Sequence, residues 1–382
     1  MNLEAFRDKI DCIDNDLLRL FEERMKVVAE VAEYKKSNNI PVLDNKREED
    51  KLQAVAGKVG EDMQQYARVL CETLFEISRS HQHGTTHETS PLCNEIKAAI
   101  ARGTNKPFPQ TATVACQGVE GAFSQEACKK LFKHPSIQYF KTFDSVFSAI
   151  ENGFCEYGVL PLENSTAGSV TKIYNLMQSR NFKIVSSIRM KIDHVLAAPK
   201  GVAKEDIREV LSHEQAISQC AGYLEKLGAN VKVVPCENTA LAAKDVSASG
   251  RTDAAAICSA ACAKLYGLNC VEKDIQDRVN NYTRFICISK NLEIYPGSNK
   301  TSIMLALPHV PGALYKVLAK FYTLGISLNK LESRPQPHRE FEFMFYLDLE
   351  TSVYTDEFFK ILDSLQEFCE EFKYLGSYIE VV

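Results

Sequence analysis

The sequence predicts a multidomain protein with three parts: an all-α N-terminal module, an α/β region, and a smaller α+β region. A length of 382 residues is too great for one ordinary core and suits two to four domains. Apolar residues recur at helical spacing from Asn2 to about Ser37, with no Pro or Gly. The pattern changes from Thr111 to short apolar strands alternating with helices, and from Thr301 to the order βαββαβ.

The composition describes a soluble globular protein, with 45% hydrophobic and 25% charged residues. A net charge of −5 and the lack of a basic tract argue against nucleic-acid binding. No signal sequence or membrane-length apolar run is present. The thirteen cysteines are scattered, and Cys258 and Cys262 have no His nearby, so we expect reduced thiols, no metal site and a cytoplasmic location.

The first helix carries cations on the face that should be buried. Its apolar stripe comprises Ile10, Ile13, Leu17, Leu20, Phe21, Val28 and Val31. Extending the stripe by sevens reaches Arg24 and Lys35, which lie about three turns or 16 Å apart. They either extend to solvent, pair with carboxylates of another helix, or bind an anion. Arg7 lies about 25 Å before Arg24 and roughly 100° around the helix, so only a second, antiparallel copy could bring the two together.

Two further helices complete the N-terminal module. Pro41 ends the first helix, Asp44 is a plausible cap for the second, and a third is expected from about Glu61 to Gln82. Ser78 and Gln82 lie one turn apart on one face of it. This arrangement resembles an all-helical chorismate mutase over residues 1–83. The family's pattern matches Arg7, Arg24, Lys35, Asp44, Arg47, Glu48, Ser78 and Gln82.

The chorismate mutase resemblance implies a role for each of these side chains. In that family two protomers interlock, so Arg24, Arg47 and the partner's Arg7 would hold the substrate carboxylates, with Ser78 assisting. Lys35 and Gln82 would face the ether oxygen, while Glu48 with Asp44 would bind the ring hydroxyl. The reaction is a unimolecular rearrangement, which needs stabilisation of developing charge and no cofactor.

Residues 84–110 are polar, apart from a short helical piece, and are expected to be a linker. Between residues 111 and 290 we expect α/β lobes with mainly parallel sheets, including helix over 207–228. Ligands of such sheets bind at the carboxyl ends of strands. The sequence predicts three segments there: Gly118–Ser124, Glu163–Ser169 and Thr283-Arg284.

These segments, taken in order with SHEQAISQC between the second and third, resemble prephenate dehydratase over residues 111–290. The resemblance implies two lobes that close on a cleft, as in a periplasmic binding protein, with Thr283 as the catalytic hydroxyl. Arg284 would hold a substrate carboxylate. Whether Thr283 donates a proton directly or relays one from Glu163 is left open. Asn164, Ser165 and Gln215 are further expected substrate contacts, and His213 is a weaker candidate for the cleft wall.

The last part, residues 299–382, looks like an ACT regulatory domain with a ferredoxin-like sheet. In ACT domains of this enzyme family, two stretches line an L-phenylalanine site between paired domains. They correspond here to Gly312, Ala313 and Leu314, where a helix opens and can meet a carboxylate, and to Glu332, Ser333 and Arg334.

The whole chain therefore resembles bifunctional chorismate mutase–prephenate dehydratases, which make phenylpyruvate from chorismate and are inhibited by L-phenylalanine. Two alternatives remain: a dehydratase that prefers arogenate, and a non-catalytic sensor of aromatic ligands. We expect no cofactor, no nucleic-acid or membrane partner, and a homodimer or homotetramer. The strength of inhibition and any channelling of prephenate are not predicted.

Overall fold

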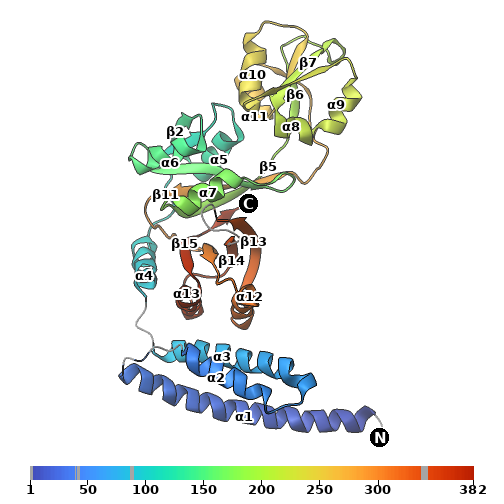
Figure 1. The fold of residues 1–382 in the computed structure, drawn as a ribbon. Helices are drawn as coiled ribbons and strands as arrows, with labels where there is room; N and C mark the ends of the chain where they lie inside the picture. Colours follow the sequence, from blue (N-terminus) through green and yellow to red (C-terminus); the bar gives the residue numbers. More distant parts are fainter. Residues whose placement is uncertain (1–2, 39, 41–43, 87–89, 337–342) are drawn as a thin grey trace.

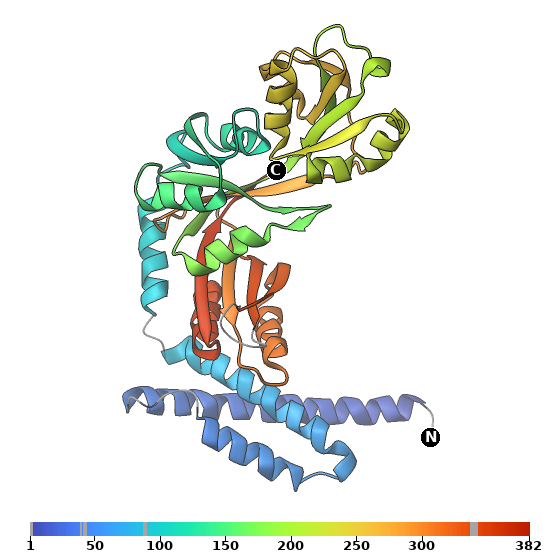
Figure 2. The same ribbon diagram turned by 45° about the horizontal axis from the view of Figure 1, so that its top comes forward.

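The computed structural model describes residues 3–38, 40, 44–86, 90–336 and 343–382. Asn2, Pro41, residues 87–89 of the expected linker, and residues 340–342 of an expected strand lie outside these ranges. Three long helices and a short 3₁₀ turn form a separate N-terminal layer (Figures 1 and 2). They are α1 (Leu3–Ser37), α2 (Asn45–Ala56), η1 (Glu61–Met63) and α3 (Gln64–Thr86). The side chain of Asp44 caps α2 by accepting from the Arg47 amide at 3.1 Å.

A seven-stranded sheet forms the first α/β lobe, with strand order β16-β5-β11-β3-β1-β2 and β4 paired to β3. Its strands are β1 (Thr111–Gln117), β2 (His134–Phe140), β3 (Tyr157–Asn164), β4 (Gly168–Ser169), β5 (Lys183–Lys191), β11 (Tyr282–Ser289) and β16 (Glu380–Val381). Its helices are α5 (Phe123–Leu131), α6 (Phe143–Glu151) and α7 (Thr171–Ser179).

A five-stranded sheet, in the order β10-β6-β9-β7-β8, forms the second lobe. Its strands are β6 (Val195–Ala198), β7 (Glu209–His213), β8 (Lys232–Cys236), β9 (Ala254–Cys258) and β10 (Asn269–Glu272). Its helices are η2 (Lys204–Asp206), α8 (Glu214–Gln219), α9 (Ala221–Leu227), α10 (Thr239–Ala248) and α11 (Ala260–Leu265). The chain crosses between the lobes twice, from β5 to β6 and from β10 back to β11, so residues 192–194 and 273–281 connect them.

Two expectations for this region are wrong. The sheets are mixed, because β11 pairs antiparallel with both β3 and β5, and β6 pairs antiparallel with β9 and β10. The expected helix over 207–228 begins as strand β7. The spacing of Ile207, Val210 and Leu211 fits a helix as well as a strand, and parallel pairing of β7 with β8 and β9 decides for the strand.

The C-terminal unit has the order βαββαβ and an antiparallel sheet, β13-β14-β12-β15. Its elements are β12 (Lys300–Ala306), α12 (Ala313–Thr323), β13 (Ser327–Pro335), β14 (Phe343–Glu350), α13 (Asp356–Phe368) and β15 (Glu371–Tyr378). One face of the sheet packs against α12, α13 and α4 (Pro91–Gly103), which lies within the expected linker. The other face shares a core with the first lobe, and β16 continues into that lobe's sheet.

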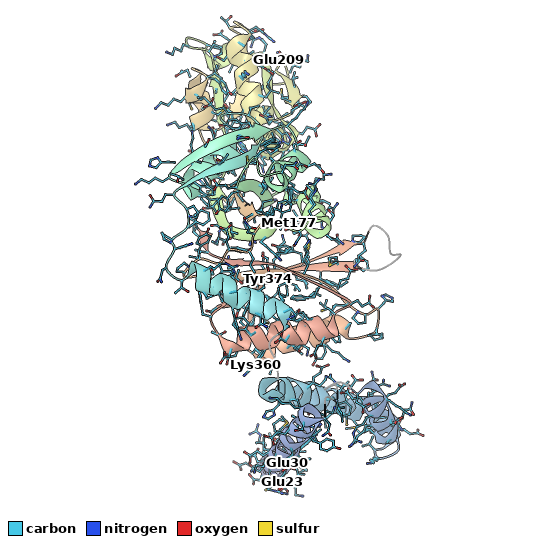
Figure 3. The ribbon with its side chains drawn as sticks, turned by 90° about the vertical axis from the view of Figure 1, so that its left-hand side faces the viewer. Glu23, Glu30, Met177, Glu209, Lys360 and Tyr374 are labelled. Atoms are coloured by element: carbon cyan, nitrogen blue, oxygen red, sulfur yellow. The ribbon has the colours of Figure 1, made fainter. Side chains whose placement is uncertain are left out.

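Contacts join the C-terminal unit to both of its neighbours. On β15, Gly376 approaches the first lobe so closely that a Cβ there would lie 2.2 Å from the Ile184 carbonyl oxygen. Lys373 donates to the Met177 carbonyl at 2.6 Å, at the end of α7, and Met177 and Tyr374 mark this boundary in Figure 3. On the opposite side, Lys320 of α12 pairs with Glu76 of α3 at 3.2 Å. Among the described residues, we find no helix with the length and apolar character needed to cross a bilayer.

Candidate functional site

A cationic cavity of about 620 Å³ lies between the three N-terminal helices. Arg24 of α1 donates to the Ser78 hydroxyl of α3, which fixes the guanidinium beside the cavity. Five cationic and two acidic side chains line it: Arg24, Lys46, Arg47, Lys51 and Lys58, with Asp44 and Asp50. An excess of positive charge in a partly enclosed cavity favours a small anion.

The remaining N-terminal candidates do not line this cavity. Lys35 is half-buried and Gln82 is buried, one turn beyond Ser78. The Glu48 carboxylate is bonded to Arg79, which also pairs with Glu76. Sequence reasoning did not identify Arg79. Arg7 is exposed on the first turns of α1 and does not line the cavity, so within one chain it is not brought to Arg24.

Helix α1 leaves most of its apolar stripe uncovered. Ala32 is its one buried residue among those described. Four members of the stripe are at least half exposed, namely Ile10, Ile13, Leu17 and Leu20, and so are Leu3, Phe6, Leu18, Val27 and Tyr34 of the same helix. Such a long uncovered stripe is typical of a surface that packs against another protein chain.

The second cavity, of about 390 Å³, lies between the two α/β lobes. Thr283 lines it, and its Oγ1 accepts a hydrogen bond from Asn164 Nδ2 at 2.9 Å. The expectation that Thr283 follows the carboxyl end of a strand is wrong, because it lies at the start of β11. Since β11 runs antiparallel to β3, its first residues meet the last residues of β3, and Thr283 pairs with Asn164 in register.

Asn164 is held by a dense hydrogen-bond network. Its Oδ1 accepts from the amides of Thr166 at 3.0 Å and Ala167 at 2.9 Å, which fixes the turn after β3. Its Nδ2 also donates to Asn281 Oδ1 at 2.8 Å. Gln219 of the second lobe donates to Thr166 Oγ1 at 2.9 Å. The network therefore orients the Thr283 hydroxyl and joins the two lobes.

His194, on the first crossing segment, extends this network. Its Nε2 lies 2.9 Å from Gln219 Oε1, which also accepts from Asn281 Nδ2 at 3.1 Å. Because that oxygen can only accept, Nε2 of His194 carries the proton. Burial lowers the pKa of His194, although the bond to Gln219 and the nearby Asp193 act in the opposite direction. A neutral ring therefore stays in the cleft wall near neutral pH.

Three other candidates have clear positions. Gln215, on α8, lines the cleft. His213 lines it too, and caps α8 by accepting from the Gln215 amide at 3.3 Å. Ser165 binds the return crossing, donating to the Asn280 carbonyl at 2.8 Å and accepting from the Tyr282 amide at 2.9 Å. Ser165 thus fixes the backbone around Thr283.

The structure does not bring Arg284 into the cleft. Successive strand residues face opposite sides of a sheet, so Arg284 points away from the side that Thr283 faces. Its guanidinium bonds Asp348, pairs with Glu380 at 3.1 Å, and donates to the Tyr378 hydroxyl at 2.6 Å. All three partners belong to the C-terminal segment.

Glu163 borders the interlobe cavity, but its carboxylate is bonded on the Arg284 side of the sheet. Its carboxylate lies 3.2 Å from Arg284 and also bonds Lys330 of β13. A proton relay from Glu163 to Thr283, which the sequence left open, has no direct hydrogen bond among the described residues, since the Thr283 hydroxyl is bonded to Asn164 instead. Among the described residues, no cluster of His, Cys, Asp or Glu is arranged to hold a metal ion.

A third cavity, of about 400 Å³, lies at the start of α12. Ala313 and Leu314 line it, together with Leu307, Val310, Phe343 and Phe345. Gly312, at the helix start, has φ = 81°, a conformation that favours glycine. Glu332 and Arg334 lie on β13 and contact the first lobe instead, at Ser169 and Thr171.

Comparison with known proteins accounts for these sites together. The model of the chorismate mutase type II family matches residues 6–83, and that of prephenate dehydratase matches residues 114–293. The bifunctional chorismate mutase/prephenate dehydratase of Aquifex aeolicus is 32% identical, covering 98% of this chain and 97% of that protein. The chain belongs to the bifunctional chorismate mutase/prephenate dehydratase family. It is an enzyme with both activities of that family.

Two further relatives match a shorter part of this chain. Arogenate dehydratase/prephenate dehydratase 2 of Arabidopsis thaliana is 39% identical, covering 76% of this chain and 79% of that protein. The crystal structure of prephenate dehydratase from Arthrobacter aurescens, in complex with L-Phe, has a TM-score of 0.64 and 27% identity, covering 70% of this chain and 89% of that one.

In this bifunctional chorismate mutase/prephenate dehydratase, sequence reasoning did not identify Asn281 and Gln219, which both belong to the hydrogen-bond network around Asn164. Asn281 precedes Thr283 by two residues, and alternation along a strand places such residues on one side. Gln219 follows Gln215 by four residues, one helical turn later. Both signals were present in segments already singled out, NNYTRF and SHEQAISQC.

Proposed function

We propose that Thr283 is the catalytic hydroxyl of the dehydratase, and that Asn164 positions it. The observation that carries this assignment is the hydrogen bond from Asn164 Nδ2 to Thr283 Oγ1 at the wall of the interlobe cavity. Loss of the ring hydroxyl from prephenate needs a proton donor at that oxygen. A threonine hydroxyl that accepts from Asn164 keeps its own proton free to be donated.

The lining of the same cavity supports the second half of this reaction. Phe123, Phe143 and Phe285 lie along it, with other apolar residues. A carboxylate loses CO₂ more readily where water is excluded, because its charge is less well solvated there than the charge-dispersed transition state. Gln215 supplies a polar contact from the second lobe, and Ser165 keeps the Thr283 backbone in place.

In the helical module, we assign the cationic cavity to chorismate. Arg24, with Ser78, and Arg47 would hold the two carboxylates, and Asp44 with Glu48 would bind the ring hydroxyl. Lys35 and Gln82 would stabilise charge on the ether oxygen. Arg7 would come from a second copy of the chain, and the uncovered apolar stripe of α1 supports such a dimer.

The decisive experiment is incubation of the purified chain with chorismate. We expect phenylpyruvate, formed through prephenate, without added cofactor or metal. Accumulation of prephenate would leave the mutase, with either a dehydratase that requires arogenate or no dehydratase at all. Competition between prephenate and arogenate in the same assay would decide the preference, which the similarity to plant arogenate dehydratases keeps open. If neither intermediate nor product forms, the chain is a sensor.

We further propose that residues 299–382 form an ACT domain that binds L-phenylalanine. The apolar cavity at the start of α12 suits the aromatic ring, and free amides at a helix start suit its carboxylate. The L-Phe complex of the Arthrobacter aurescens dehydratase supports this ligand. Glu332 and Arg334, which contact Ser169 and Thr171, would connect such a site with the turn that follows Asn164.

Millimolar L-phenylalanine is therefore expected to inhibit the dehydratase and to raise the melting temperature. Gly312→Ala should weaken both effects, because alanine disfavours φ = 81° at the helix start. Gly153→Ala is the matched control, since Gly153 has φ = 76° and, like Gly312, open space around its Cα. Equal responses in the two variants, or no response of the parent enzyme, would contradict the proposal.

A further inference from the structure

A smaller and more polar cavity of about 290 Å³ adjoins the interlobe cleft that contains Thr283. Gln215 and Gln219 line both cavities. Two consecutive hydrogen bonds also connect them, from Asn164 to Thr283 at 2.9 Å and from Asn164 to Asn281 at 2.8 Å. The catalytic hydroxyl and the polar cavity are therefore close enough for one small substrate to reach both.

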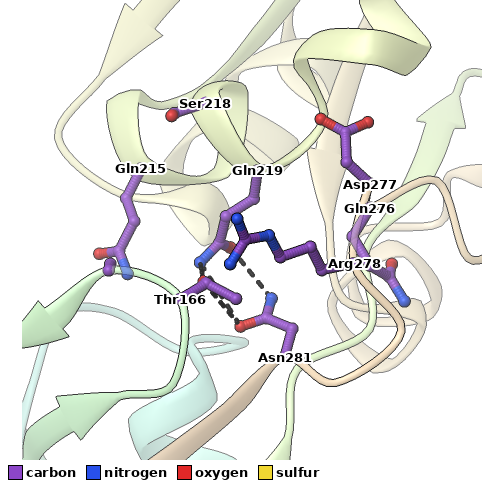
Figure 4. A pocket seen from close by; sticks show the side chains of 9 residues that line it. Thr166, Gln215, Ser218, Gln219, Gln276, Asp277, Arg278 and Asn281 are labelled. Carbon is purple, nitrogen blue, oxygen red and sulfur yellow. Dashed lines mark hydrogen bonds between the residues drawn. The ribbon is translucent and has the colours of Figure 1, made fainter.

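Arg278 extends into this polar cavity from the return crossing between the lobes (Figure 4). Among the residues that line the two cavities, it is the one lysine or arginine. Arg284, the cation expected there, is bound to acids of the C-terminal segment. In the part of the chain that the structure describes, Arg278 makes no ion pair, and the carboxylate of neighbouring Asp277 accepts from the Gly222 amide at 3.1 Å.

We infer that Arg278 binds the side-chain carboxylate of the dehydratase substrate, the one that remains in the product. This inference rests on the proposed dehydratase function. The two substrate carboxylates have different needs, and the two cavities match them. The carboxylate that leaves as CO₂ belongs in the apolar cleft beside Thr283, whereas the retained one needs a cation in a polar, accessible place.

The groups around Arg278 suit a carboxylate held between the return crossing and the second lobe. Gln215, Ser218 and Gln219 come from α8 of the second lobe, and Thr166 comes from the turn after β3 in the first. The side-chain amide of Gln215 and the hydroxyl of Ser218 can share one carboxylate with the guanidinium. Thr166 and Gln219 instead already donate to Asn164 and Thr166, respectively, and fix the wall behind it. Prephenate and arogenate both carry this carboxylate, so Arg278 serves either substrate.

The role predicts a specific kinetic signature. The retained carboxylate is unchanged through the reaction, so Arg278 binds the ground state and the transition state equally. Removing its charge should raise KM without changing kcat. A charge-assisted hydrogen bond corresponds to a rise of about 10- to 100-fold. The inhibition constant of phenylpyruvate should rise by the same factor, because the product keeps the carboxylate.

The test compares Arg278→Gln with Lys273→Gln in the full-length enzyme. Lys273 is an exposed cation on the same crossing segment that lines neither cavity, so its variant controls for loss of positive charge near the cleft. We expect the raised KM and product inhibition constant in Arg278→Gln alone, with partial recovery in Arg278→Lys. Mutase activity of each variant reports that the chain is folded.

Three results would overturn the inference: an unchanged KM in Arg278→Gln, an equal rise in Lys273→Gln, or a fall in kcat at constant KM. A parent enzyme that forms neither phenylpyruvate from prephenate nor phenylalanine from arogenate would instead refute the dehydratase assignment on which the inference rests. The two failures are thus separated by the parent enzyme measured in the same series.

Discussion

Replacing Thr283 with alanine is expected to lower kcat of the dehydratase step by about 10²- to 10⁴-fold, the usual contribution of a positioned proton donor. The hydroxyl that Asn164 orients would be lost, while the cavity around it would keep its shape. The measurement is phenylpyruvate formation at saturating prephenate. KM should change little, since the variant keeps the contacts that hold the rest of the substrate.

Thr283→Ser is the matched variant for this experiment, because it restores the hydroxyl and removes only a methyl group. We expect it to recover most of the activity. Chorismate mutase activity of the same preparations should equal that of the parent, since the N-terminal helices form their own cavity. Dehydratase activity of the alanine variant within a few-fold of the parent would show that another group supplies the proton.

The helical module was the part most readily predicted from sequence. Local spacing along the chain is enough to predict the long helix α1 with its apolar stripe, the Asp44 cap and the cations on the buried face. In the structure Arg24, Asp44 and Arg47 line one cavity, and Ser78 is bonded to Arg24. The partner of Glu48 could not be predicted in the same way. Arg79 of α3 pairs with Glu48 of α2, and the sequence does not show how these two helices pack against each other.

The α/β region shows where sequence reasoning fails for physical reasons. The direction of a strand within a sheet depends on which distant strands it pairs with. The antiparallel pairing of β11 with β3 and β5 could therefore not be predicted from local sequence. The side of the sheet that a side chain faces depends on the strand register. A difference of one residue therefore places Thr283 in the cleft and Arg284 at the contact with the C-terminal unit. Thr283 of the motif lines the interlobe cavity, as expected from the sequence, whereas the geometry does not support the role expected of Arg284.

The neighbouring residues Thr283 and Arg284 face different parts of the molecule. One peptide bond separates the hydroxyl in the cleft from a guanidinium bound to the C-terminal segment. Glu163 and Asn164 repeat this division on β3, since Glu163 bonds Lys330 while Asn164 bonds Thr283. Movement of the C-terminal sheet would thus be transmitted to both strands that contribute Thr283 and Asn164 to the interlobe cleft.

Arg284→Met is accordingly expected to destabilise the enzyme by about 3–5 kcal/mol, the cost of leaving the buried Asp348 carboxylate without its cation, whereas Glu380 keeps Lys300 at 2.5 Å. The Asp348 side chain is only 2% exposed and that of Glu380 6%, so neither can recover its hydration without unfolding. The measurement is thermal unfolding at neutral pH, where the transition of the α/β and C-terminal units should fall by about 10 °C.

Arg189→Met provides the matched control. Arg189 pairs with Arg284 in register on β5 and also approaches Glu380, at 3.4 Å, but its side chain is 50% exposed. An exposed ion pair contributes under about 1 kcal/mol to the free energy of unfolding, so the melting temperature of this variant should be close to that of the parent. If Arg284 instead held substrate, Arg284→Met would raise KM for prephenate and leave the unfolding transition unchanged. That outcome would contradict an interface role, because loss of a buried cation cannot leave the stability of its acidic partners unaltered.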